Sequence, residues 1–143
     1  MLDTLIGTHA SLATLILRVT LGVIFVAHGY PKLFKEPGPE GVSGFLQSLK
    51  VPAPLFFAYV VGIVEFFGGI LVIVGLFTRP AAILIAINML VAMWILKFKT
   101  GLVSKVMEGG WVGGYELDVA LMAMALALAA TGAGHFSLEL LLR

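Results

Sequence analysis

Four long apolar runs dominate the sequence and restrict the folds that it can adopt. They cover residues 12–30, 54–77, 80–98 and 115–134. Each is near the length of about 20 residues that an α-helix needs to cross a membrane. The runs are continuous instead of alternating, and an open sheet edge cannot face lipid, so strands are not expected there. We predict an all-α membrane protein, a bundle of four transmembrane helices in a single domain over residues 1–143.

Composition supports this class and excludes several others. Hydrophobic residues make up 60% and charged residues 12% of the chain, both far from the values of soluble domains. A net charge of +1 without a basic stripe argues against nucleic acid as a partner. The absence of cysteine excludes thiol chemistry, cysteine-ligated zinc and iron–sulfur clusters within this chain. We find no motif for a flavin, a nicotinamide or a metal, and we predict no metal site.

The connections between the runs differ in kind. Residues 78–80 form a tight turn with proline at the start of the next helix, so the second and third helices should be antiparallel neighbours. The connection over residues 31–53 is longer, and its middle places Phe45, Leu46 and Leu49 on one side of a short helix. We expect that helix to be interfacial or re-entrant.

Basic residues are distributed unevenly between the two ends of the predicted bundle. Lysines gather in or beside loops 31–53 and 99–114, whereas the opposite side has only Arg79 and Arg143. Because short loops rich in lysine and arginine stay in the cytoplasm, we expect both loops there, both termini outside, and a multi-pass location in the inner (plasma) membrane. The first run lacks the basic region that precedes a signal peptide, so we expect it to be retained.

Five polar residues, Arg18, Glu65, Asn88, Glu116 and Asp118, lie inside or just inside the predicted spans, and the first three lie deepest. Rise per residue places Arg18 about 10 Å, Asn88 about 12 Å and Glu65 about 18 Å from the end that holds the termini. A charge within the bilayer costs about 2.5–3.5 kcal/mol on insertion scales, so these side chains should face the bundle interior. We predict that Arg18 reaches Glu65 as a buried pair, with Asn88 hydrogen-bonded nearby. Whether the pair serves function or only fixes helix register stays open.

Small residues share the helix faces of these charges. In phase with Arg18 or Glu65 are Gly22, Phe25 and Gly29 in the first helix and Ala58, Gly62 and Gly69 in the second. Small side chains let membrane helices approach closely. The polar and the small residues therefore indicate one common interior.

A second polar layer is predicted nearer the lysine-rich end, from His28 and Glu116. Glu116 heads a helical face of small residues, namely Ala120, Ala123, Ala127, Ala130 and Gly134. We expect this face to pack inward and Glu116 to close the polar cluster, whereas Asp118, about 200° around the helix, reaches the headgroups. For His28 two interpretations stay open, a hydrogen-bonded boundary residue or a ligand-binding residue.

Three stretches together resemble the DoxX family of small four-helix membrane proteins. They are LRVTLGVIFVAHGYPKLF, similar to the family's arginine, glycine and HG..KL pattern, then VEFFGGILVIVGLFTRPAA, and then GGYELDVALMAMALALAATGAGHFSLE. The resemblance covers nearly the whole chain. Two positions depart from it: Glu139 stands where aspartate is usual, and His135 stands where a basic residue is frequent.

The resemblance implies a membrane component of a redox system, because the family is named after a subunit of an archaeal quinone-linked sulfur oxidation system. It implies no established catalytic residues. The first candidate function is therefore a subunit that binds a quinone or another small molecule, with Arg18, His28, Glu65 and Glu116 as hydrogen-bond donors or proton carriers and a redox partner protein as the electron source. The alternatives are a non-catalytic interaction or assembly protein and a small-molecule transporter. The lipid bilayer is a partner in each case, and a homo-oligomer is compatible with all three.

Overall fold

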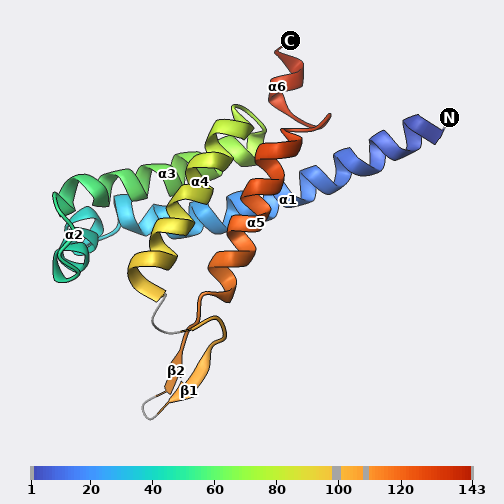
Figure 1. The fold of residues 1–143 in the computed structure, drawn as a ribbon. Helices are drawn as coiled ribbons and strands as arrows, with labels where there is room; N and C mark the ends of the chain where they lie inside the picture. The colour runs from blue at the N-terminus through green and yellow to red at the C-terminus, as the bar shows by residue number, and fades with distance from the viewer. Residues whose placement is uncertain (1, 98–100, 108–109, 143) are drawn as a thin grey trace.

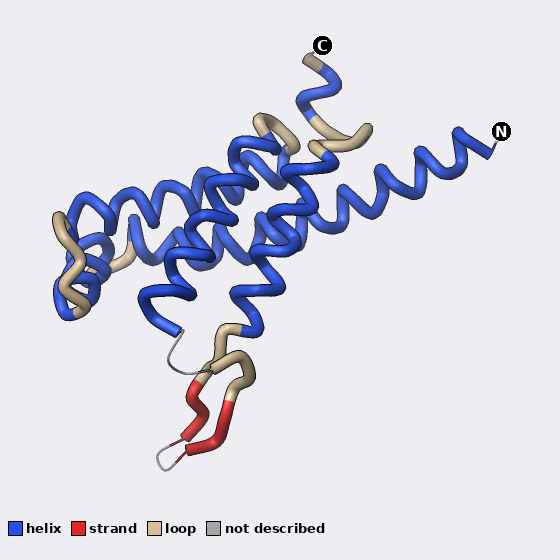
Figure 2. The backbone as a smooth tube through the Cα atoms, viewed as in Figure 1, coloured by secondary structure: helices blue, strands red, loops and turns tan. Residues whose placement is uncertain are grey.

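The computed structural model describes residues 2–97, 101–107 and 110–142. Helices account for most of them, and the strands form one short antiparallel hairpin (Figure 2). In chain order the elements are α1 (Leu2–Phe34), α2 (Gly38–Ser48), α3 (Pro54–Val74), α4 (Thr78–Ala92), the π-helical turn η1 (Met93–Lys97), β1 (Lys105–Met107), β2 (Gly110–Val112), α5 (Glu116–Thr131) and α6 (Leu138–Leu141). The predicted fold class, an all-α membrane protein, is confirmed.

The long helices pack as two pairs. α1 lies along α3, and α4 lies along α5 and crosses the first pair (Figure 1). The core between the pairs is apolar, with Leu21 and Phe25 of α1 packed near Ile85 of α4 and Leu128 of α5. α2 packs against α3 near the C-terminal end of α1, and the hairpin lies beyond the C-terminal end of α4. The short helix predicted within residues 31–53 is therefore present as α2.

Glycines bring α1 and α3 together. A Cβ atom on Gly22 would lie 2.6 Å from the carbonyl oxygen of Gly69, and one on Gly69 would lie 2.8 Å from that of Gly22. A Cβ atom on Gly29 would lie 2.8 Å from the Cα of Phe66. Real side chains do not tolerate such contacts with backbone, so only glycine permits this helix spacing. The prediction that the small residues of these two helices face the interior is confirmed.

Within the part of the chain that the structure describes, three helices are long and apolar enough to cross a membrane: Ser11–Phe34, Pro54–Val74 and Thr78–Ile95. α5 has 16 residues, which extend about 24 Å and fall short of a typical span. It nevertheless returns along α4, because a Cβ on Gly132 at its C-terminal end would lie 3.1 Å from Nε of Arg79 near the start of α4. The count of four spans and the orientation of the termini stay predictions.

Two element boundaries differ from the predicted ones. α1 continues through Pro31 to Phe34, whereas the sequence predicted an end at residue 30. Proline removes one backbone donor, but here it stands in the last turn, where only the carbonyl of Ala27 loses its helical partner. In the third connection, the sequence predicted a loop and the structure has the β1–β2 hairpin.

The buried face of α5 is not the predicted one. Asp118, Leu121, Ala125 and Leu128 are buried, whereas Ala120, Ala123 and Ala130 are exposed. The small residues of this contact lie on α4 instead, where Ala81, Ala82 and Ala86 are buried in the same core. Because α4 supplies the small surface, α5 fills the contact with leucines, and the prediction from its alanine face was wrong.

Candidate functional site

A cavity of about 440 Å³ opens between the C-terminal end of α1, α2, α3 and the end of α4 with η1. Its walls are mostly apolar. They include Phe45 and Leu46 of α2, Val61 of α3, Val91 of α4 and Ile95 of η1. This volume lies within the range of about 300–1,000 Å³ that is usual for small-molecule sites.

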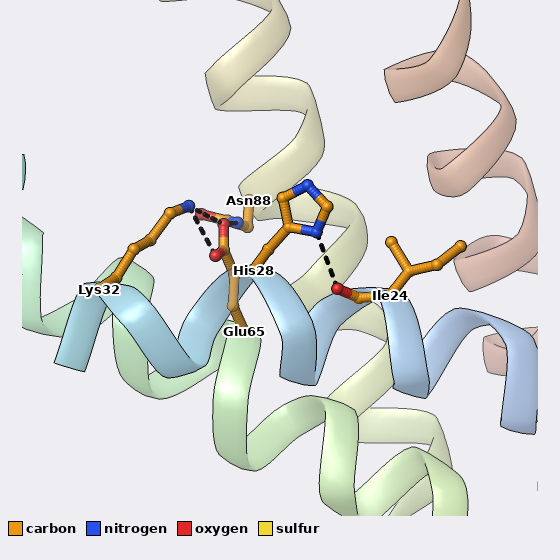
Figure 3. A network of polar contacts seen from close by, with 5 residues as sticks. All are labelled: Ile24, His28, Lys32, Glu65 and Asn88. Carbon is orange, nitrogen blue, oxygen red and sulfur yellow. Dashed lines mark hydrogen bonds and ion pairs between the residues drawn. The ribbon is translucent and has the colours of Figure 1, made fainter. Parts of the chain in front are cut away.

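The polar side chains that line the cavity are the exposed Lys35 and Glu36 and a hydrogen-bonded triad from three helices. The Nζ atom of Lys32 donates to both carboxylate oxygens of Glu65, at 2.7 Å and 2.6 Å. The amide Nδ2 of Asn88 donates to Glu65 Oε1 at 3.1 Å. Figure 3 shows the two donors meeting at the carboxylate from α1 and α4. The Glu65 side chain is 4% exposed and that of Lys32 is 30% exposed, so a buried anion is paired with a cation that reaches the surface.

The close approach of α1 and α3 places this triad. Gly29 lies against the backbone of Glu65 and Phe66, and Lys32 follows on the same face three residues later. Because α1 continues past Pro31, the backbone of Lys32 is part of the helix, which fixes the direction of its side chain. Glu65 lies eleven residues from the start of α3 at Pro54, about 16 Å along a helix and thus near the middle of that span.

The π-helical turn η1 borders the same cavity through Ile95. A π-helical turn adds a residue to the helical repeat, so the side chains after Ala92 leave the α-helical pattern of α4. Such turns occur frequently at functional sites. The π-helical turn at its border therefore supports this cavity as the candidate functional site.

Arg18 does not belong to the triad. Its Nε donates to the carbonyl of Val72 at 3.1 Å, its Nη2 to that of Ile73 at 3.1 Å, and its Nη1 to that of Ala133. Val72 lies seven residues beyond Glu65 on α3, about 10 Å along the helix. The predicted Arg18–Glu65 pair is therefore wrong. Carbonyls in the last turn of a helix lack the usual partner four residues on and carry the negative end of the helix dipole, so they hold a buried guanidinium without a carboxylate.

Glu116 also lies outside the triad. It is exposed, and its Oε1 accepts hydrogen bonds from the backbone amide of Ser104 at 3.0 Å and from the Ser104 hydroxyl. It thereby ties the start of α5 to the connection before the hairpin. The predictions that Glu116 points inward and Asp118 outward are reversed in the structure, because α5 presents Asp118 to the core.

His28 lies one turn before Lys32 on α1 (Figure 3). Its ring is exposed, and Nδ1 lies 2.8 Å from the carbonyl oxygen of Ile24 in its own helix. This contact fits the boundary interpretation. Of the five predicted site residues, the structure thus brings together Glu65 and Asn88, whereas Arg18 and Glu116 lie elsewhere.

Sequence reasoning missed Lys32 as a site residue. It assigned Lys32 to a loop because Pro31 precedes it. A signal was present, since Lys32 follows Phe25 by seven residues and Gly29 by three, which is the helical repeat of the buried face.

Comparison with known proteins places the chain in a family. The family model described as DoxX matches residues 13–97. The Bacillus subtilis (strain 168) protein named "Putative oxidoreductase CatD" is 35% identical over 128 residues, which cover 90% of this chain and 85% of that protein. The inner membrane protein YphA of Escherichia coli (strain K12) is 28% identical over 133 residues, 93% of this chain and 92% of that protein.

A further relative has a name that describes only its location. The uncharacterized membrane protein Rv3486 of Mycobacterium tuberculosis (strain ATCC 25618 / H37Rv) is 30% identical over 132 residues, 86% of this chain and 77% of that protein. No solved structure matches the chain. The family match covers more than half of the chain and includes all three residues of the triad, and the chain belongs to the DoxX family of membrane proteins.

Proposed function

We propose that this DoxX protein is the membrane component of a redox system and that it binds a quinone in the cavity at the Lys32–Glu65–Asn88 triad. One observation carries the proposal: an apolar cavity within the transmembrane region ends at two hydrogen-bond donors and a carboxylate. A quinone ring needs an apolar slot, donors for its carbonyl oxygens and a group that exchanges protons. The name of the Bacillus subtilis relative, which contains the word oxidoreductase, points in the same direction.

The triad supplies each of these functions from a separate group. The ammonium of Lys32 and the amide of Asn88 donate hydrogen bonds, so they orient a carbonyl oxygen at the inner end of the cavity. Glu65 holds both donors in place and offers a site for a proton. Lys32 is partly exposed, which connects this carboxylate to the water at the end of the bundle.

The rim of the cavity suits a ligand dissolved in the membrane. Val91 is 47% and Ile95 39% exposed, and both lie in the span Thr78–Ile95. Their exposed apolar surface therefore faces lipid. A quinone would enter from the bilayer over these side chains, and its isoprenoid tail would stay outside the cavity. A redox partner protein would supply or accept the electrons.

The test is quinone binding by the purified protein. We expect quinone to co-extract with protein purified in mild detergent, and decyl-ubiquinone or a short-chain menaquinone to bind in a titration. Asn88→Leu removes one donor and should weaken binding about tenfold, the effect of one hydrogen bond in a dry site. Asn88 is uncharged, so its replacement breaks no ion pair. Of the three triad residues, it therefore allows a test of binding with the least damage to the fold.

Two controls belong to the titration. Lys50→Met removes an exposed lysine outside the cavity, and Glu40→Gln an exposed carboxylate outside it. Both should bind quinone as the unmodified protein does. If quinone neither co-extracts nor binds, or if Asn88→Leu and Lys50→Met have the same affinity, the proposal is wrong. Co-purification of a partner protein without quinone would favour the assembly function instead.

A further inference from the structure

A second cavity, of about 270 Å³, lies at the other end of the bundle. Ser11 of α1, Arg79 of α4, the end of α5, the connection between α5 and α6, and Glu139 and Leu140 of α6 line it. In Figure 1 this connection lies beside the turn from α3 to α4. The lining differs from that of the first cavity, because most of it is polar or charged: it holds a guanidinium, an imidazole, a carboxylate and three hydroxyls.

This cavity lies at the level of the lipid headgroups. The candidate spans of α3 and α4 end and begin here, at Val74 and Thr78, so the residues around the cavity mark one edge of the hydrocarbon layer. Exposed apolar side chains adjoin it, with Leu140 47% and Phe136 52% exposed. A molecule in the cavity would therefore have its polar part among charged groups and any chains beside apolar side chains.

The cavity wall is held in place from several sides. Arg18 donates to the carbonyl of Ala133, and the amide of Glu139 donates to the carbonyl of Gly75 at 3.0 Å. The hydroxyl of Ser11 lies 3.1 Å from Nδ1 of His135. These contacts tie the connection after α5 to α1 and to the end of α3, so the cavity is formed before any ligand arrives.

The wall presents opposite charges at two places. Arg79 offers a guanidinium, which suits a phosphate because its donors form a planar fork. Glu139 offers a carboxylate on the same wall, alongside the interactions it already has. A simple anion would meet the guanidinium but also the repulsion of Glu139. A ligand with a phosphate and a primary ammonium would meet both charges favourably.

We propose that this cavity binds the zwitterionic headgroup of a phospholipid, with the phosphate at Arg79 and a primary ammonium at Glu139. Phosphoethanolamine has this chemistry. A phosphocholine headgroup carries the same charges, but its quaternary ammonium donates no hydrogen bond to a carboxylate. The site is independent of the proposed quinone site, because it lies at the opposite end of the spans and shares no residue with it.

The experiment compares lipids that differ only in headgroup. Dioleoyl phosphatidylethanolamine, phosphatidylcholine and phosphatidylglycerol are offered to delipidated protein in detergent, and retained lipid is counted by native mass spectrometry. Inorganic phosphate and free phosphoethanolamine are offered separately, with the rise in unfolding temperature as the readout. We expect phosphatidylethanolamine to be retained about fivefold over the other two lipids, the effect of one partly exposed charge pair.

Variants assign the two charges. Arg79→Gln should lose binding of phosphatidylethanolamine and of phosphatidylglycerol, and Arg79→Lys should keep part of it. Glu139→Gln should keep binding but lose the preference for phosphatidylethanolamine. The exposed pair of controls at the other end, Lys50→Gln and Glu40→Gln, should change neither.

Three results would overturn the proposal. One is equal retention of all three lipids. Another is a preference that survives both Arg79→Gln and Glu139→Gln. The third is inorganic phosphate raising the unfolding temperature as much as free phosphoethanolamine, which would indicate a site for free anions. Quinone binding should be unchanged in Arg79→Gln, so failure here is distinguishable from failure at the triad.

Discussion

The two ends of the bundle treat a buried charge in opposite ways. At one end, Arg18 is 2% exposed and donates to three backbone carbonyls, two of them in the last turn of α3. At the other end, Glu65 is paired with a side chain, Lys32, beside an open cavity. A charge held by backbone has no room to exchange partners. A charge held by a partly exposed side chain at a cavity does, and this difference separates the structural end from the candidate functional end.

The largest effect is expected from removing the structural charge. Arg18→Met removes the guanidinium donors of three carbonyls, those of Val72, Ile73 and Ala133, and unties the connection at Ala133 from α3. We expect it to destabilise the protein by about 3–5 kcal/mol, as for a broken buried charge network. Thermal unfolding in detergent measures this, with the exposed Lys35→Met as the control. A shift no larger than that of the control would mean that Arg18 does not hold this end together.

A smaller effect is expected from separating the two helices that position the triad. In Gly29→Ala the new methyl group meets the backbone of Phe66 and Glu65, so α1 and α3 must move apart. We expect a loss of about 2–3 kcal/mol, as for overpacking against rigid neighbours, together with weaker quinone binding.

Gly44→Ala is the matched control for this change. A Cβ atom at Gly44 has nothing within 4 Å, and alanine is the better helix former in α2. This variant should be neutral or slightly more stable. Equal unfolding temperatures for the two variants would show that α1 and α3 are not in tight contact at Gly29.

The sequence predicted the class of fold and the α1–α3 interface well, for a physical reason. Charges and glycines repeat along the same helix face. Charges avoid lipid and glycines allow close contact between helices, so the repeat of both identifies the face that points to the interior. Apolar residues carry no such information in a membrane protein, because core and lipid are equally apolar. The buried face of α5 was therefore predicted wrongly, since alanines on one side and leucines on the other satisfy lipid equally well.

The pairing of charges was the other limit. Depth along each helix placed Arg18 and Glu65 near the same level, but depth does not fix the partner. Backbone carbonyls at a helix end bind a guanidinium without any signature in the sequence. Lys32 was placed in a loop because a proline usually marks a helix boundary. Here Pro31 stands inside the last turn of α1, and the helix includes Lys32. One wrong boundary thus changed both ion-pair assignments.

The smallest and most informative effects are expected within the triad itself. Lys32→Met leaves Glu65, 4% exposed, with Asn88 as its remaining donor, and should cost about 1–2 kcal/mol because the carboxylate stays buried and poorly compensated. Glu65→Leu should cost less than about 1 kcal/mol, because the lysine that remains is partly exposed and can extend its ammonium into water. The double variant should resemble Glu65→Leu in stability, since neither leaves a buried charge.

Detergent unfolding and quinone titration of all three variants separate the two roles of the pair. A double variant that is stable but no longer binds quinone would assign the pair to the ligand. If instead Glu65→Leu lowers the stability more than Lys32→Met does, the Lys32 ammonium cannot extend into water. The cavity end would then be as rigid as the end held by Arg18.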